Sequence, residues 1–219
     1  MTADGEALPG GMVNAGSVFR RGALVERPAP RNARALHAHL RALGERGFDA
    51  APVPVGRTAD TRAAWSRDLA DPEGGTMLCH NDVCPENVVF RDGRAAALID
   101  FDMSAPGRPL WDVAMAARYW VPAIDPVSAA VLHPAGLDAP ARLRVLADGY
   151  GLSAQDRAAL PGVIEQATEV CRAFVAARVA QGDPVYLRSL AEHGGWERWD
   201  RIQTWLTARR ETFTAALLT

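Results

Sequence analysis

The sequence predicts an α+β fold, with a small β-rich N-terminal part and a mainly helical C-terminal part. Two hairpins are indicated by apolar runs on either side of the dipeptides Arg21-Gly22 and Asp92-Gly93. Aspartate and glycine tolerate the positive φ angles of tight hairpin turns, so the second signal is strong. From residue 142 onward, apolar residues recur at helical spacing. Hairpin signals early in the chain and helical periodicity late in the chain together give the fold class.

The N-terminal part is expected to contain one hairpin, one helix and one extended segment. The strands of the hairpin are predicted at residues 17–20 and 23–26. The helix is predicted at residues 32–46, capped by Asn32, because three leucines recur at helical spacing. Two prolines indicate an extended segment at the edge of a sheet over residues 48–55.

Helices are predicted through most of the chain after residue 108. Pro109 is a favourable first helical residue, and Pro122 ends the helix that follows it. A proline-rich loop is predicted at residues 125–140, and Pro161-Gly162 is expected to break a helical run. The remaining helices are predicted at residues 142–150, 163–181, from 184 onward, and 196–217.

Polar side chains are expected to meet at the open end of the second hairpin. Its strands are predicted at residues 88–90 and 95–99, with Asn87 just before the first and Asp100 just after the second. Antiparallel pairing therefore places these two residues side by side. Asp82 precedes Asn87 by one short loop and can reach the same place. Two carboxylates and an amide thus come together.

Oxygen ligands of this kind suit Mg²⁺, which binds one or two carboxylates together with substrate phosphates. The order His-x-Asp-x-x-x-x-Asn, then a hairpin, then Asp is also that of the catalytic and metal loops of kinases. In kinases the first Asp receives the proton of the attacking hydroxyl, and the Asn and the second Asp hold the metal ions. The alternative is a surface hairpin with polar ends, which leaves the agreement of spacing, turn and residue types unexplained.

Three segments resemble the aminoglycoside phosphotransferase family, the small-molecule branch of the kinase-like fold. His80–Asn87 resembles its His-Gly-Asp-x-x-x-x-Asn motif, with Asn81 in place of the usual glycine. Ile99–Asp102 resembles its metal-binding segment, and Pro106–Ala114 resembles the Gly-x-x-x-x-Asp-x-Ala stretch that follows. The resemblance implies that Asp82 is the catalytic base. It also implies two metal ligands and two structural residues of the catalytic loop, namely Asn87 and Asp100, and His80 and Asp112.

The resemblance further implies a protein-kinase-like arrangement. Residues 1–60 would form a reduced N-terminal β lobe with one helix, and residues 61–75 a short linker. Residues 76–219 would form a helical C-terminal lobe that carries the catalytic and metal loops. The implied cofactors are Mg²⁺ and ATP, or GTP in its place. The implied reaction moves the γ-phosphate of the nucleotide to a hydroxyl of a small molecule.

The resemblance offers three residues for nucleotide binding. Gly10 and Gly11 would belong to a loop over the phosphates, where missing side chains let backbone N–H groups approach. Kinases hold the phosphates with a strand lysine, but this stretch contains none, and Arg27 would take that place. Arginine holds phosphate as a bidentate fork. The alternatives are an ordinary glycine loop and a solvent-facing arginine at a strand end.

The segment at residues 56–75 is shorter than the resemblance requires. A full family member has two further strands here, a hinge that receives adenine, and helices beneath the catalytic loop. The alternative function is therefore that of a degenerate kinase-like protein, which binds a ligand or partner without catalysis. A missing helix would also expose an apolar face, so a homodimer that covers the shortened region is a further expectation.

Composition limits the kinds of binding partner and the cellular location that the sequence predicts. The chain of 219 residues has 48% hydrophobic and 23% charged residues and a net charge of −2. These values are ordinary for a globular protein, and they give no footprint for nucleic acid or for an anionic membrane. Neither a membrane span nor a signal peptide is predicted, and the sparse cysteines indicate reduced thiols. A cytoplasmic location is therefore expected.

Overall fold

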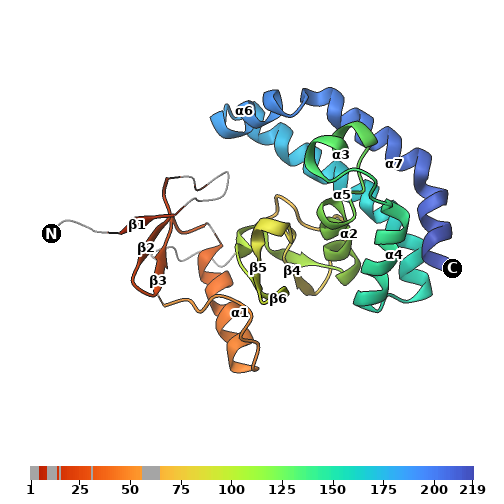
Figure 1. The fold of residues 1–219 in the computed structure, drawn as a ribbon. Coiled ribbons are helices and arrows are strands. Elements are labelled where there is room, and N and C mark those ends of the chain that lie inside the picture. The colour runs from red at the N-terminus through yellow and green to blue at the C-terminus, as the bar shows by residue number, and fades with distance from the viewer. Residues whose placement is uncertain (1–4, 9–13, 15, 31, 56–64) are drawn as a thin grey trace.

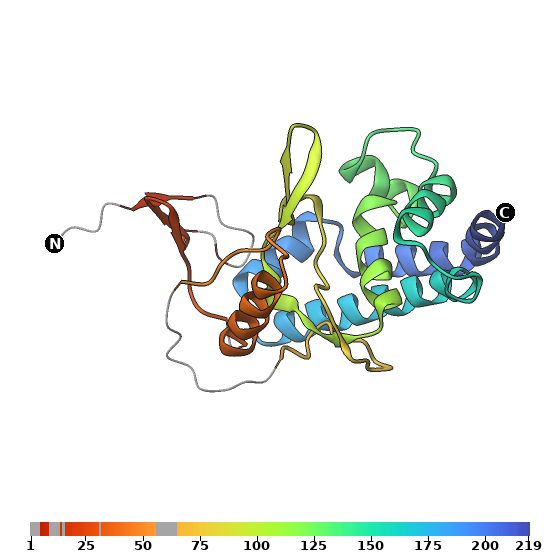
Figure 2. The same ribbon diagram turned by 90° about the horizontal axis from the view of Figure 1, so that it is seen from below.

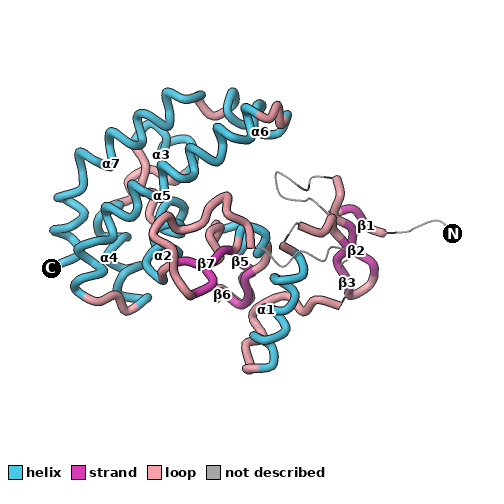
Figure 3. The backbone as a smooth tube through the Cα atoms, turned by 180° about the vertical axis from the view of Figure 1, so that it is seen from behind, coloured by secondary structure: helices cyan, strands magenta, loops and turns pink. Residues whose placement is uncertain are grey.

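The computed structural model describes residues 5–8, 14, 16–30, 32–55 and 65–219. The fold is α+β, as the sequence predicted, with small antiparallel sheets and mostly helical structure. The helices from α2 to α7 gather at one end of the molecule, and the first three strands lie at the other end (Figures 1 and 3).

The N-terminal sheet has the strand order β1 (Glu6–Ala7), β2 (Phe19–Arg21) and β3 (Leu24–Glu26), with antiparallel pairing throughout. The hairpin predicted in this region is confirmed, and Arg21 lies opposite Leu24 beside the turn. No sequence pattern indicates β1, because two residues are too few to show an alternation.

Helix α1 covers Ala33–Glu45, which confirms the helix predicted at residues 32–46. Leu36 and Leu40 are buried and form a small core with Phe101. The predicted cap is wrong, because the Asn32 side chain makes no cap hydrogen bond. Its amide instead donates to the carbonyl oxygen of Asp102 at 3.1 Å, which ties the start of α1 to the loop after the second hairpin.

Two small antiparallel strand pairs occupy the middle of the chain. The predicted second hairpin is formed by β5 (Val88–Arg91) and β6 (Arg94–Leu98), and it projects from the body of the protein in Figure 2. The other pair is β4 (Met77–Cys79) with β7 (Ala105–Gly107), which no sequence pattern indicates. The chain before β4 passes so close to β7 that a Cβ atom on Gly75 would lie 2.1 Å from the Gly107 carbonyl group. Only glycine fits there.

The helical part contains the main core. Its helices are α2 (Pro109–Trp120), α3 (Pro126–Leu132), α4 (Ala139–Tyr150), α5 (Ala154–Ala180), α6 (Pro184–Glu192) and α7 (Gly195–Leu218). The long helices α5 and α7 pack along each other, and α2 crosses α5 (Figure 1). Side chains from α2, α4, α5 and α7 share one apolar cluster. None of the described helices combines the length and the apolarity that a membrane crossing needs.

Two predictions about the helices are wrong. Residues 125–140 are not all loop: α3 forms there, because the Asp125 side chain accepts hydrogen bonds from the backbone N–H groups of Val127 and Ser128. Pro161 does not break α5. Proline in a helix costs roughly 3 kcal/mol, and burial of its neighbours, including Leu160 and Ile164, offsets that cost.

The described residues between α1 and β4 form no helix or strand, and residues 56–64 lie outside the description. The predicted edge segment at residues 48–55 is not a strand. It does run beside β6, where the Ala50 carbonyl oxygen accepts a hydrogen bond from the Leu98 amide at 2.8 Å. Farther along, the Leu69 carbonyl oxygen accepts a hydrogen bond from the Trp111 indole.

An ion pair between Asp71 and Arg108 holds this segment to the start of α2. The Asp71 side chain is fully buried and accepts hydrogen bonds from Nε, Nη2 and the backbone N–H of Arg108, at 2.7, 2.9 and 3.0 Å. Burial raises the pKa of Asp71, but the hydrogen bonds from Arg108 outweigh burial and hold the pKa below its usual value. The carboxylate therefore stabilises the fold above its unfolded-state pKa of about 3.9, and this stabilisation is lost as the pH falls through the folded-state pKa.

We expect Asp71→Asn to lower the free energy of unfolding by about 3 kcal/mol at pH 7, because it leaves Arg108 without its buried partner. The difference from the wild type should shrink at a pH below the unfolded-state pKa of about 3.9, because the native carboxylate takes up its proton as the pH falls. Urea denaturation at the two pH values measures both effects. Asp68→Asn, which removes an exposed pair with Arg178, is the matched control and should cost less than about 1 kcal/mol. An Asp71→Asn cost that is independent of pH would contradict the assignment.

Candidate active site

The loop after β4 is held by a carboxylate from the first turn of α2. The backbone N–H groups of His80 and Asn81 donate to the two oxygens of Asp112, each at 2.8 Å. The His80 ring is buried, and its Nε2 lies 3.0 Å from the Ile99 carbonyl oxygen at the end of the hairpin. The residues predicted as structural supports, His80 and Asp112, thus connect the loop to α2 and to the hairpin.

Asn81 stands at the position where the family motif has glycine. Its backbone has a φ of 66°, in the left-handed region that glycine adopts freely and that asparagine tolerates better than most residues. The side chain is completely buried and donates to the Met103 carbonyl oxygen at 2.9 Å. Asparagine therefore keeps the backbone conformation and adds a contact that glycine cannot make.

Asp82 lies at the centre of the site with both carboxylate oxygens in use. The Tyr119 hydroxyl donates to one oxygen at 3.2 Å, and the Asn87 amide donates to the other at 3.0 Å. The same amide also donates to the Asp82 carbonyl oxygen at 2.9 Å. Burial raises the pKa of Asp82, and the hydrogen bonds from Tyr119 and Asn87 oppose this only in part. The site therefore holds a partly desolvated, oriented carboxylate.

Two residues of α2 complete the surroundings of Asp82 and were not predicted. The Tyr119 hydroxyl contacts the carboxylate itself, and the Trp120 indole donates to the Val83 carbonyl oxygen at 2.7 Å. Tyr119 follows Asp112 by two helical turns, so both side chains lie on one face of α2. That spacing is the sequence signal that could have indicated Tyr119.

Asn87 and Asp100 are brought together by the hairpin, as predicted from the antiparallel pairing. The Ile99 amide donates to the Asn87 carbonyl oxygen at 3.0 Å, so Asp100, which follows Ile99, lies beside Asn87 at the open end of the hairpin. Asp100 has a φ of 61°, in the left-handed region, which aspartate adopts more readily than most residues with a side chain. Residues other than glycine that are held in this region cluster at functional sites.

Arg27 contacts carboxylates. Its guanidinium donates to Asp100 at 3.0 Å and forms a two-pronged pair with Asp102, with one contact at 2.7 Å. Burial raises the pKa of Asp102, Arg27 lowers it, and the neighbouring Asp100 raises it again, with a raised value as the result. Two like charges are thus held side by side by one guanidinium. Arg27 was predicted to hold the nucleotide phosphates. Its guanidinium lies beside Asp100, one of the two predicted metal ligands.

The oxygen atoms present fit Mg²⁺ in type. The Asn87 amide nitrogen faces Asp82, so the amide oxygen is the atom left for a cation, and Asp100 uses one carboxylate oxygen for Arg27 and keeps a second. Throughout the described part of the chain, no group of three or more His, Cys, Asp or Glu side chains could hold a metal ion. A cation at Asn87 and Asp100 would therefore need further oxygen ligands, which nucleotide phosphates supply. The predicted phosphate loop at Gly10 and Gly11 lies outside the described residues.

Comparison with known proteins gives the family. The phosphotransferase enzyme family matches residues 14–146, which include the site from Arg27 to Tyr119. The trifolitoxin immunity protein of Rhizobium leguminosarum bv. trifolii is 29% identical over 157 residues, or 66% of this chain. The chain spans 55% of the length of that relative. No solved structure matches this chain. Because the family match covers more than half of the sequence, the chain belongs to the phosphotransferase enzyme family, and the resemblance to aminoglycoside phosphotransferases is confirmed.

Proposed function

We propose that the protein transfers the γ-phosphoryl group of a nucleoside triphosphate, ATP or GTP, to a hydroxyl of a small molecule. The observation that carries the proposal is the meeting of Asp82, Asn87 and Asp100 at the end of one hairpin, in a member of a phosphotransferase family. Phosphoryl transfer depends mostly on positioning and on neutralisation of charge, so a short set of residues suffices.

In this proposal Asp82 orients the acceptor hydroxyl and receives its proton. A bond forms between the acceptor oxygen and the γ-phosphorus. The bond from that phosphorus to the oxygen that bridges it to the β-phosphate breaks, and the nucleoside diphosphate leaves. Asn87 and Asp100 would hold Mg²⁺, which supplies charge neutralisation on the phosphates when bound. Tyr119 and Asn87 fix the Asp82 carboxylate, and His80 and Asp112 fix the loop that carries it.

The arrangement is proposed to be kinase-like, with residues 1–60 as a reduced β lobe, residues 61–75 as a linker and residues 76–219 as the helical lobe. Arg27 is a residue of the reduced lobe that reaches the site. In the nucleotide complex its guanidinium, which pairs with Asp100 and Asp102, would hold the phosphates.

The test is calorimetric titration of the protein with Mg²⁺-ATP and with Mg²⁺-GTP, for the wild type and Asp100→Asn. Asparagine keeps the left-handed backbone of position 100 and removes only the charge, so it is preferable to alanine. We expect at least one nucleotide to bind the wild type, with affinity roughly tenfold weaker or worse in the variant. Asp92→Asn, at a left-handed position in the hairpin turn, is the matched control and should bind as the wild type. Equal affinities for the wild type and Asp100→Asn would refute the metal assignment.

A second candidate function is ligand binding without catalysis, and one observation favours it. The Arg27 guanidinium pairs with both Asp100 and Asp102, and so it meets the charge that a cation would otherwise meet. The relative is named as an immunity protein, and both chemical modification and sequestration of a toxin would provide immunity. No heat from either nucleotide at millimolar concentration, with folded protein, would support this second candidate over the first.

A further inference from the structure

Asp102 lies two residues beyond the predicted metal ligand Asp100, and the proposed mechanism gives it no role of its own. Its carboxylate forms a two-pronged ion pair with Arg27: Nη1 of the guanidinium donates to one oxygen at 2.7 Å, and Nη2 donates to the other. The pair joins positions 75 residues apart in the sequence. It is largely shielded from solvent, since the side chains of Arg27 and Asp102 are 29% and 19% exposed. The pair is therefore a tertiary contact that holds the guanidinium in one orientation.

The two aspartates hold the guanidinium to different degrees. Asp100 accepts a single hydrogen bond, from Nη1 at 3.0 Å. Asp102 uses both of its oxygens on two nitrogens of Arg27. A two-pronged contact fixes the plane of a guanidinium as well as its position, whereas a single contact leaves the plane free to turn. Asp102 is thus the residue that determines how Arg27 is oriented.

This pairing leaves one edge of the guanidinium for another anion. The N–H groups of an arginine form two edges that each fit two oxygens, one made by Nη1 with Nη2 and the other by Nε with Nη2. The contacts with Asp100 and Asp102 use both N–H groups of Nη1 and one of Nη2. Among the described residues, no oxygen accepts a hydrogen bond from Nε or from the second N–H of Nη2. The edge made by Nε and Nη2 therefore matches two phosphate oxygens.

The segment that carries Asp102 is itself fixed against α1. The Asp102 carbonyl oxygen accepts the hydrogen bond from the Asn32 amide at 3.1 Å, and the neighbouring Phe101 packs into the small core with the leucines of α1. Arg27 lies in the connection between β3 and α1. The Arg27–Asp102 pair therefore ties the end of β3 to a loop that the start of α1 already holds, so the orientation of the guanidinium depends on packed elements.

Helix α1 offers no other carboxylate near Arg27. In protein kinases the strand lysine pairs with a glutamate of the neighbouring helix, and this pair must be in place for transfer. From Ala33 to Glu45, the acidic residue of α1 is Glu45 at its end. It lies twelve positions after Ala33, which is roughly 18 Å along the helix axis. The loop after the second hairpin therefore supplies, through Asp102, the carboxylate that the start of the helix lacks.

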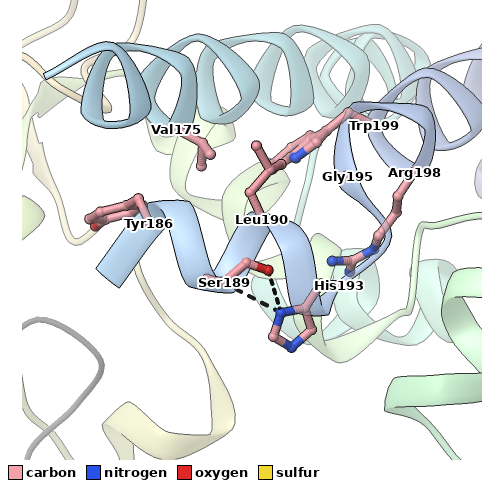
Figure 4. Close-up of a pocket in the computed structure, with 8 residues that line it drawn as sticks. All are labelled: Val175, Tyr186, Ser189, Leu190, His193, Gly195, Arg198 and Trp199. Carbon is pink, nitrogen blue, oxygen red and sulfur yellow. Dashed lines mark hydrogen bonds between the residues drawn. The ribbon is translucent and has the colours of Figure 1, made fainter. Parts of the chain in front are cut away.

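Another partly buried arginine offers a less suitable place for phosphates. Arg198 lines a hollow between α5, α6 and the first turn of α7, which is drawn in Figure 4. The hollow has a volume of about 80 Å³, below the roughly 300–1,000 Å³ of most small-molecule sites. Arg27 instead contacts a predicted metal ligand directly, through its hydrogen bond to Asp100. Of these two arginines, Arg27 is therefore the one placed to hold phosphates beside a cation.

We infer that Asp102 is a positioning residue, which holds the Arg27 guanidinium so that the edge made by Nε and Nη2 binds the phosphates of the nucleotide. The class of ligand, a polyphosphate, rests on the proposed function. Asp102 acts through Arg27 and itself contacts neither the phosphates nor the cation. Phosphate binding therefore depends on Asp102 even without a cation, although the negative charge of Asp102 by itself repels phosphate.

The test titrates the protein with inorganic triphosphate in the absence of divalent cations and nucleotide. We expect the wild type to bind it and Asp102→Asn to bind it about tenfold more weakly, because asparagine cannot form the two-pronged ion pair. The sign separates three roles. Loss of a negative charge alone would tighten the binding of an anion, and loss of a cation ligand would have no effect without a cation. Glu6→Gln, which removes the exposed partner of Arg20 in the N-terminal sheet, is the matched control and should bind as the wild type.

A double-mutant cycle shows whether Asp102 acts through Arg27. Arg27→Gln alone should weaken triphosphate binding about tenfold or more. The variant that combines Arg27→Gln with Asp102→Asn should bind no more weakly than Arg27→Gln, because the group that Asp102 positions is already absent. Thermal unfolding shows whether each variant is folded. Where Asp102→Asn does not fold, Arg27→Lys takes its place: lysine keeps the charge but cannot make the two-pronged contact, so it should bind as weakly as Arg27→Gln.

The outcome is separable from that of the proposed function. Triphosphate binding that needs both Arg27 and Asp102 supports the inference even where neither nucleotide binds, and in that case the proposed function alone is refuted. Three results overturn the inference whatever the nucleotides do: no triphosphate binding by the wild type, binding by Asp102→Asn that equals or exceeds that of the wild type, and additive effects of the two substitutions.

Discussion

Replacement of Asp82 by asparagine is expected to reduce phosphoryl transfer by roughly 10²–10⁴-fold and to leave the protein folded. The amide cannot accept the proton of the acceptor hydroxyl, and general base catalysis contributes a factor of this size. Asparagine has nearly the same shape as aspartate, so the contact with Tyr119 can persist. Release of nucleoside diphosphate, measured with water and with hydroxylated small molecules as acceptors, gives the rate. Equal rates for the variant and the wild type would exclude Asp82 as the base.

The same variant should be at least as stable as the wild type at neutral pH. Burial raises the pKa of Asp82 in the folded state. The native protein therefore binds this proton more tightly than the unfolded chain, and its stability falls as the pH rises between the unfolded-state and folded-state pKa values. Asparagine does not titrate, so the variant does not lose this free energy of unfolding as the pH rises. Its greater stability should vanish below about pH 4, where Asp82 is protonated in both the folded and the unfolded protein. An activity lost together with stability would instead indicate a structural role.

Asp112→Ala is expected to lower the free energy of unfolding by about 2–5 kcal/mol. It leaves the backbone N–H groups of His80 and Asn81 without acceptors in a buried loop, and each unpaired group costs about 1–3 kcal/mol. Urea denaturation measures the change. Activity should fall as well, because the same loop carries Asp82.

Asp200→Ala is the control for this prediction. It removes an exposed aspartate that pairs with Arg172 on the surface, and it should cost less than about 1 kcal/mol. Asp112→Asn keeps one of the two acceptor oxygens and should fall between the wild type and Asp112→Ala. A stability of Asp112→Ala equal to that of Asp200→Ala would show that the loop does not depend on this carboxylate.

The elements and residues that could be predicted are those with local causes. The hairpin at β5 and β6 follows from the turn chemistry of Asp92-Gly93, and it alone brings Asn87 next to Asp100. The leucines of α1 and the apolar repeat of α7 recur at helical spacing, which the sequence shows by itself. In each case the controlling interactions lie within a few positions along the chain.

What the sequence could not indicate depends on residues far apart along the chain. The pairing of β4 with β7 joins segments nearly thirty residues apart, and three-residue strands carry no pattern of their own. Helix α5 continues through Pro161 because burial against neighbouring helices outweighs a local penalty. Local sequence favours a break there, and only packing reverses it.

The sequence by itself determined the family motif, the hairpin and the residues that meet at its end. Only the tertiary structure decided which groups surround them, because the partners come from other elements: Tyr119 from α2 for Asp82, and Arg27 from beyond β3 for Asp100 and Asp102. Charge compensation and burial are properties of the packed chain, since they depend on which distant side chains come within a few ångströms.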